Sequence, residues 1–267
     1  MTHTAALGAP LTRIGWRTAL LASLLYVAFL IISAPAAALV WAITAATGRV
    51  VSLERAQGRI WNGQGTLVVA DQSRVFHRVT QLRWDWLPAR MMAGELALRI
   101  EVEDPRLHGG ARVAYSREGA HASDGAFHIE TSVLAEYVPQ LIPAGLTGDL
   151  SIRTEEFALR NDGYSGVATI EMRNVASVHS SVHPLGEYRA LVVGAGEQVE
   201  FRVDTLNGAL LVEGRGTWSR GSGLNFAGSA RAASTHKTAL TPLLRFFGPD
   251  LGGEHPIRVS GLYQLAL

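Results

Sequence analysis

The segment LALRIEVE, residues 96–103, alternates apolar side chains with small or charged ones. Successive side chains of a β-strand point to opposite faces, so this alternation predicts a strand with one face on a core and the other in water. The same alternation occurs at 199–204 and at 257–261, and a shorter example at 208–212 ends near Gly214. Half-buried strands are therefore the dominant predicted element.

Turn signals built on glycine separate these strands, at Asn62-Gly63, Gly109-Gly110, Asn161-Asp162-Gly163, Asn207-Gly208 and Gly221-Ser222-Gly223. Short strands joined by such turns predict antiparallel hairpins and meanders. The polar residues between the apolar ones predict sheets that face water on one side.

Two short segments of this region are predicted to be helices. The first, residues 132–138, is followed by two prolines. The second lies within 238–247, where Pro242 fits the first turn of a helix capped by Thr241 and Gly248 fits the position after its end. The predicted fold class is mainly β: a twisted or curled antiparallel sheet domain with two short helices, preceded by one transmembrane helix.

Composition excludes several classes of function. The chain has 267 residues, with 24 Lys and Arg, 23 Asp and Glu, and no cysteine. A net charge of +1 argues against a general nucleic-acid binder, which usually carries a basic excess. The lack of cysteine excludes disulfides, thiol catalysis and thiolate metal sites.

The N-terminal region contains a long apolar run, because residues 18–48 include no charged side chain. A membrane-spanning helix needs roughly 20 apolar residues, so the sequence predicts a single transmembrane anchor over 18–43. Arginine and tryptophan, which favour the membrane–water interface, flank this run as Arg13, Trp16, Arg17 and Trp41. The proline at position 35 is expected to kink or end the helix.

A cleaved signal peptide with an alanine-rich end at 33–38 is the alternative interpretation of this run. The apolar residues continue past that end to Ile43, which favours the anchor. The basic tail, residues 1–17, contains no acidic residue, and this favours a cytoplasmic N-terminus. Residues 44–267 are then predicted to form a β-rich domain outside the cytoplasm, in the periplasm of a double-membraned bacterium.

The β-rich region shows traces of an internal repeat. Its predicted halves are about 49–150 and 151–267. The first half contains GRIWNG at 58–63, and the second contains GRGTWSRG at 214–221. Both halves also place a predicted helix before a glycine-containing strand.

Candidate chemical sites are weak in this sequence. His179 and His183 have a spacing that would suit zinc on a helix, but Pro184 beside them indicates a loop. Asp124 and His128 lie near serines, yet no G-x-S-x-G motif accompanies them. We predict no catalytic residue, no cofactor-binding residue and no metal ligand.

Carboxylate pairs have an equally simple interpretation. Glu155 and Glu156 are adjacent, so on a strand they point to opposite faces and do not cooperate. Glu101 and Glu103 share a face, which we interpret as the wet side of their strand.

Three tryptophans cluster before residue 90. Trp84 and Trp86 are predicted to point to the same face of one strand, and Trp61 precedes them. Such a stripe is more often core packing than a ligand platform. The alternative is an exposed aromatic patch for a partner or for lipid.

Several motifs follow one another in an order that resembles a known family. They are GRIWNGQG at 58–65, LRWDWLP at 82–88, MMAGEL at 91–96, LTGDL at 146–150, a closing helix at 240–248 and a final strand at 261–262. The residues that carry them are Gly58, Trp61, Gly63, Trp84, Trp86, Pro88, Gly94, Gly148, Gly248 and Gly261. Together they resemble the type II secretion system protein N family, although Trp86 stands where an aliphatic residue is more usual.

This resemblance implies a single-pass inner-membrane accessory component of the machine that exports folded periplasmic proteins across the outer membrane. It implies no catalytic site and no cofactor. The implied partners are other inner-membrane components and the outer-membrane secretin. The residues themselves also support a second hypothesis, in which one-sided sheets rich in leucine, valine and aromatic residues curl into a groove for lipid or another hydrophobic ligand.

Overall fold

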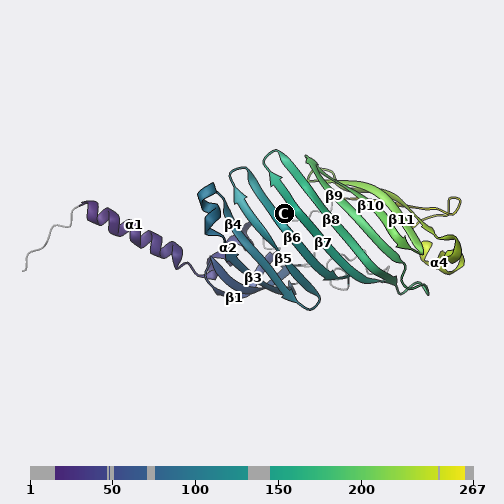
Figure 1. The fold of residues 1–267 in the computed structure, drawn as a ribbon, viewed down its shortest axis with the longest axis horizontal. Helices are drawn as coiled ribbons and strands as arrows, with labels where there is room; N and C mark the ends of the chain where they lie inside the picture. Colours follow the sequence, from purple (N-terminus) through teal and green to yellow (C-terminus); the bar gives the residue numbers. More distant parts are fainter. Residues whose placement is uncertain are drawn as a thin grey trace, which may run out of the picture.

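A single antiparallel sheet dominates the computed structural model, which describes residues 16–46, 48, 51–70, 76–131, 145–245 and 247–261. Within these residues thirteen strands lie in chain order, and each is hydrogen-bonded to its neighbours in the sequence (Figure 1). The sheet is open, because β1 and β13 form its two edges. The predicted mainly-β antiparallel fold is confirmed.

The strands are long and the connections between most of them are short turns. In chain order they are β1 Val51–Gly58, β2 Asn62–Ala70, β3 Phe76–Trp86, β4 Leu96–Asp104, β5 Leu107–Ser116, β6 Gly119–Glu130, β7 Leu146–Arg160, β8 Gly163–Ser177, β9 Gly186–Gly196, β10 Gln198–Gly208, β11 Leu210–Ser219, β12 Gly223–Ala232 and β13 His255–Gly261. The helical elements are α1 Trp16–Ile32, α2 Ala36–Ala46, the 3-10 helices η1 Pro88–Ala93 and η3 Ser234–His236, and α4 Lys237–Leu244.

The register places large apolar residues of every strand on one face of the sheet. Directly opposed residues of an antiparallel pair point to the same side, so the face can be followed from pair to pair. For example, Ile152 lies opposite Ile170 and Phe127 lies opposite Ile152. We call this side the apolar face, and one residue per strand illustrates it: Leu53, Leu67, Trp84, Ile100, Val113, Phe127, Ile152, Ile170, Val192, Phe201, Val212, Phe226 and Val259.

Bulges keep this face continuous where the sequence does not alternate. Asp124 and Asn174 have left-handed backbone with φ of 50° and 51°, and the register shifts beside each of them. A bulge inserts one residue and changes the phase of the following side chains. Ala122 before the bulge and Phe127 after it therefore point to the same side although they are an odd number of residues apart.

The opposite, polar face contains a buried carboxylate. Glu171 on β8 is 9% exposed at its side chain and lies directly opposite Arg189 on β9. Arg189 donates two hydrogen bonds to Oε1, at 2.8 and 3.1 Å, and Arg173 donates one to Oε2 at 3.0 Å. The hydrogen bonds from Arg189 and then Arg173 outweigh burial and hold the pKa of Glu171 below its ordinary value.

Helices cover the apolar face near its two ends. Leu39, Val40 and Ile43 of α2 pack around Leu53 and Trp84 at the β1–β3 end. Three leucines of α4 pack on β9, β11 and β12 near the other end. Between these ends, representative apolar side chains such as Leu98, Ile152 and Val192 are half-buried among the described residues.

The N-terminal apolar run is divided, which corrects the prediction of one continuous helix over 18–43. α1 ends at Ile32 and α2 begins at Ala36, with Pro35 between them. Proline has no N–H to donate and disfavours helix at the preceding residue. The break between the helices therefore lies at Pro35, where the sequence predicts a kink or a helix end. Among the described helices, none is both long and apolar enough to cross a membrane.

Other element predictions need smaller corrections. Gly109-Gly110 lies inside β5 instead of a turn, and β11 continues past Gly214 to Ser219. α4 begins at Lys237, and Thr241 is not its cap but donates its hydroxyl to the Lys237 carbonyl within the helix. The predicted helix at 132–138 and the predicted flank residue Arg13 lie outside the described residues, and the relation between the two halves stays a prediction.

The carboxylate on the polar face makes a pH-dependent prediction. Because the folded pKa of Glu171 is lowered, its contribution to stability is present above its unfolded pKa, which is near 4.5, and is lost as the pH falls through the folded pKa. Glu171→Gln should therefore lower the free energy of unfolding by about 1 kcal/mol at pH 7, and the difference from wild type should shrink below pH 4.5.

Denaturant unfolding of the purified full-length chain at several pH values measures this difference. Glu155→Gln, at an exposed position of β7, is the matched control and should change little. A difference for Glu171→Gln that stays constant from pH 7 to pH 3 would show that the ion pairs do not act as described.

Candidate functional site

Several motif residues from the first hundred positions lie around the indole of Trp84. Its side chain is 1% exposed. Its Nε1 donates to two carbonyl oxygens of the β1–β2 connection, Ile60 at 3.1 Å and Arg59 at 3.3 Å. A tryptophan is rarely buried completely unless its N–H has a partner. Trp84 therefore occupies the core position predicted for it, since its ring is buried and its N–H has hydrogen-bond partners.

Two glycines make room for this arrangement. A Cβ atom on Gly63 would lie 2.5 Å from Cζ2 of Trp84 and 2.5 Å from the carbonyl oxygen of Gln57. Gly58 has a left-handed φ of 94°, and a Cβ there would lie 2.6 Å from the Asn62 carbonyl oxygen. The motif thus has glycine where the chain turns tightly against the indole. We call Gly58, residues 59–61, Gly63 and Trp84 the tryptophan node.

The tryptophan node also holds the break between the two N-terminal helices. Ile60 donates its backbone N–H to the Ala34 carbonyl at 2.9 Å, and Pro35 forms an isolated antiparallel bridge with Arg59. Ala36, the first residue of α2, is buried in the same cluster as Trp84. The connection that carries the indole's hydrogen-bond acceptors is therefore the one that fixes where α1 ends.

Trp61 of this node packs on Trp86 of β3. Their ring centroids are 4.7 Å apart with the planes tilted by 41°, and the Trp86 backbone N–H donates to the Trp61 carbonyl at 2.7 Å. Both line a hollow of about 430 Å³ with Ile32 of α1 and Met91 of η1. The indole Nε1 of Trp86 is buried without a hydrogen-bond partner among the described residues. Trp84 is thus a core residue, whereas Trp61 and Trp86 border an open hollow.

Pro88 and Gly94 bracket the 3-10 helix that adjoins this hollow. Pro88 is its first residue, and Gly94 ends it in left-handed backbone with φ of 78°. The Gly94 N–H donates to the carbonyls of Arg90 and Met91, and β4 begins two residues later at Leu96. These positions form a short rigid turn into a strand.

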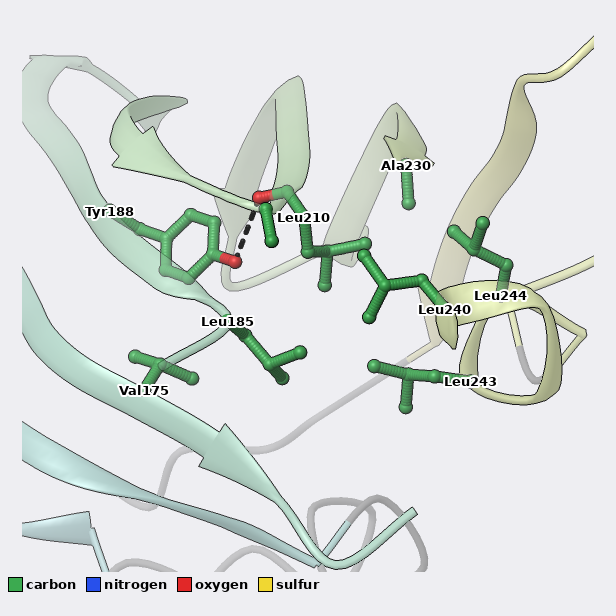
Figure 2. Close-up of a cluster of buried hydrophobic side chains, with 9 residues drawn as sticks. Val175, Leu185, Tyr188, Leu210, Ala230, Leu240, Leu243 and Leu244 are labelled. Carbon is green, nitrogen blue, oxygen red and sulfur yellow. Dashed lines mark hydrogen bonds between the residues drawn. The ribbon is translucent and has the colours of Figure 1, made fainter. Parts of the chain in front are cut away.

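The C-terminal motif lies in a second cluster, which Figure 2 shows. Leu240, Leu243 and Leu244 of α4 are buried against Leu185 and Leu210. Tyr188 lies beside them and donates its hydroxyl to the Leu210 carbonyl at 2.9 Å. Burial raises the pKa of the Tyr188 phenol above its ordinary value. This cluster closes the apolar face at the end opposite the tryptophan node.

The remaining motif glycines have separate places. Gly148 lies at a bulge of β7, where its carbonyl accepts a hydrogen bond from the buried Thr131 hydroxyl at 2.6 Å. Gly248 follows α4 and accepts one from Nδ1 of His255 at 2.8 Å. Gly261 ends β13 opposite Leu224. The structure therefore brings only part of the motif residues together, in the tryptophan node, and Gly148 and Gly261 lie apart from it.

The two described membrane-flank residues that have side-chain positions are both exposed. Trp16 begins α1 and is 72% exposed, and Trp41 on the outer side of α2 is 75% exposed. Arg17 lies in the first turn of α1. Trp41 thus belongs to α2, the helix that packs on the sheet, and not to α1.

The weak chemical candidates are not brought together into a site. Asp124 pairs with Arg112, whereas the His128 ring stacks on His108 with centroids 5.2 Å apart. Glu103 pairs with Arg83 at 3.2 Å, as expected for the wet side of β4. In the part of the chain that the structure describes, no group of three or more His, Cys, Asp or Glu side chains could hold a metal ion.

The glycine next to Trp84 gives a sharp test of the node. Gly63→Ala should lower the free energy of unfolding by about 2 kcal/mol, because the added methyl group overlaps the indole and a backbone carbonyl. The matched control is Gly221→Ala in the β11–β12 turn, where a Cβ atom meets nothing within 4 Å. Thermal or denaturant unfolding with Trp fluorescence measures both, and equal stability of the two variants would contradict the described packing.

Comparison with known proteins supplies the family. No curated protein and no solved structure matches this chain. The family model for type II secretion system (T2SS), protein N, matches residues 49–258. That match contains the tryptophan node, the whole of β1 to β12 and α4. The chain belongs to the type II secretion system protein N family.

Proposed function

We propose that this type II secretion system component is a membrane-anchored accessory subunit that supports export of folded periplasmic proteins through protein–protein contacts. Family membership over residues 49–258 is the observation that carries the proposal. The partners are other inner-membrane components of the machine and its outer-membrane secretin. The role is non-enzymatic in this proposal, because the catalytic candidates are not brought together: Asp124 pairs with Arg112, and the His128 ring stacks on His108.

The exposed apolar surface of α1 supports a place in the inner membrane. Its large described side chains are roughly half or more exposed and include Leu21, Leu24, Leu25, Phe29, Leu30 and Ile32. A helix that is apolar on all sides is suited to a hydrocarbon environment. The 17 residues of α1 reach about 25 Å at 1.5 Å per residue, which is shorter than the roughly 30 Å hydrocarbon core. The proposal therefore requires the bilayer to thin locally around α1.

In this proposal the membrane part ends at Ile32, earlier than the predicted residue 43. α2 instead packs on the sheet, so the tryptophan node lies immediately outside the membrane. The strands then succeed one another away from α1 (Figure 1). With strands about 4.8 Å apart, the α4 cluster on β9, β11 and β12 lies up to roughly 50 Å from the membrane end. Such an elongated sheet suits a subunit that contacts partners at different depths of the periplasm.

Deletion of the gene tests the secretion role. We expect folded exoproteins to accumulate in the periplasm of the deletion strain and to return to the medium when the wild-type chain is supplied. The periplasmic and extracellular pools are compared by immunoblotting. Release of a periplasmic marker enzyme is monitored as the control for a leaky outer membrane. Normal export in several growth conditions would contradict the proposal.

A second candidate function is handling of lipid or another hydrophobic ligand, and the half-buried apolar face favours it. Phe201 and Phe226 stack on this face with centroids 5.8 Å apart. They lie over Gly216 and Gly214, which leave the space that the rings occupy. Toward the middle of the sheet, Leu98, Ile152 and Val192 are not completely buried by described residues. An apolar face of this extent provides surface for an acyl chain.

Native mass spectrometry of gently purified full-length chain tests this candidate. Wild type should retain lipid, and Ile170→Glu on the apolar face should lose most of it. Thr169→Glu, the adjacent residue on the polar face of β8, is the matched control and should retain it. Circular dichroism checks that both variants are folded. Wild-type protein without bound lipid would contradict this candidate.

A further inference from the structure

A short turn carries the most exposed of the large apolar side chains that the structure describes. Met92 of η1 is 94% exposed and its neighbour Met91 is 54% exposed. None of the residues of η1 is buried. Methionine is normally a core residue, so two adjacent exposed methionines are unusual on a protein surface.

Backbone hydrogen bonds and one exposed ion pair hold this turn. Arg90 and Glu95 form an ion pair at 3.1 Å across the turn, and the Glu95 N–H donates to the Arg90 carbonyl at 3.1 Å. The Leu87 N–H donates to the Ala97 carbonyl at 2.9 Å, which ties the start of the turn to β4. The methionines are therefore presented outward by a well-bonded support.

Two exposed apolar residues of the sheet lie in the strands that follow this turn. Leu96 is 46% exposed and Tyr115 is 65% exposed, and they lie directly opposite each other in the β4–β5 pair. The 3-10 helix η1 packs against β4, and we call the exposed apolar residues Met91, Met92, Leu96 and Tyr115 of these neighbouring elements the methionine patch. Grouped exposed apolar side chains mark interaction sites more often than single ones do.

The methionine patch adjoins the end of the apolar helix. Met91 and Ile32, the last residue of α1, line the same hollow, together with Trp61 and Trp86. Tryptophan favours the membrane–water interface. Arg59 and Asp85 also line the hollow, so it contains one cation and one anion. Apolar and aromatic side chains thus meet at the end of α1, beside this charged pair.

We propose that the methionine patch contacts the lipid surface of the membrane that holds α1. This inference rests on the proposed membrane position of α1, because Ile32 then marks the level of the interface and Met91 lies beside it. Lipid is the occupant because the apolar surface of α1 continues through the shared hollow into the patch. The contact gives the sheet a second attachment point, which fixes its orientation relative to the membrane.

Site-specific labelling tests the contact, since the chain has no cysteine of its own. Met92→Cys carries a fluorophore in the full-length chain, reconstituted in vesicles of phosphatidylethanolamine and phosphatidylglycerol. Leu24→Cys on α1 reports on the anchor, and Ser222→Cys in the exposed β11–β12 turn is the aqueous control. Quenching is measured with doxyl-labelled lipids and with aqueous iodide.

Doxyl lipids should quench the labels at positions 24 and 92 several-fold more strongly than the label at 222. The label at 92 should be quenched more by shallow doxyl groups than by deep ones. Quenching at 24 with none at 92 would overturn the inference and leave the anchor intact. No lipid quenching at 24 would overturn the membrane position itself. Shielding at 92 that occurs only in native membranes with the secretion machinery would assign the patch to a protein partner instead.

Discussion

The register of the antiparallel sheet is the constraint on which the rest of the structure depends. Directly opposed residues share a face, so thirteen strands paired in chain order carry one apolar face from Leu53 to Val259. A slip of one residue in any pair would turn the apolar residues of the following strands toward water. The bulges at Asp124 and Asn174 prevent such a change of phase where the sequence no longer alternates. The helices can cover the ends of this face only because the face is continuous.

The tryptophan node connects this sheet to the N-terminal helices. Trp84 reaches the node through β3, and its indole hydrogen-bonds the connection that also binds Ala34 and Pro35. The connection that accepts the Trp84 hydrogen bonds therefore also bonds the segment between α1 and α2, where Pro35 breaks the helix. Fold and proposed function meet at this point, since a secretion subunit anchored by α1 would transmit its position to the sheet through the node.

Part of this architecture could be predicted from the sequence. Unbroken alternation at 96–103, 199–204 and 257–261 predicts β4, β10 and β13, and spacing places Trp84 and Trp86 on one face. The division of the apolar run was less accessible, because α1 and α2 are similarly apolar and only Pro35 separates them. The burial of Trp84 depends on Gly63, which lies opposite it in the neighbouring strand. That contact follows from the register, which a single sequence does not contain, and the same is true of the methionine patch.

Cross-strand disulfides test the register most directly, because the chain has no cysteine to interfere. Arg153 and Thr169 lie opposite each other in the β7–β8 pair at the middle of the sheet. Cysteines at these two positions should form a disulfide under mild oxidation of the folded protein. Cysteines at Arg153 and Ala168, one residue out of register, should not, because their side chains point to opposite faces. A disulfide in the shifted pair and none in the opposed pair would contradict the continuous apolar face.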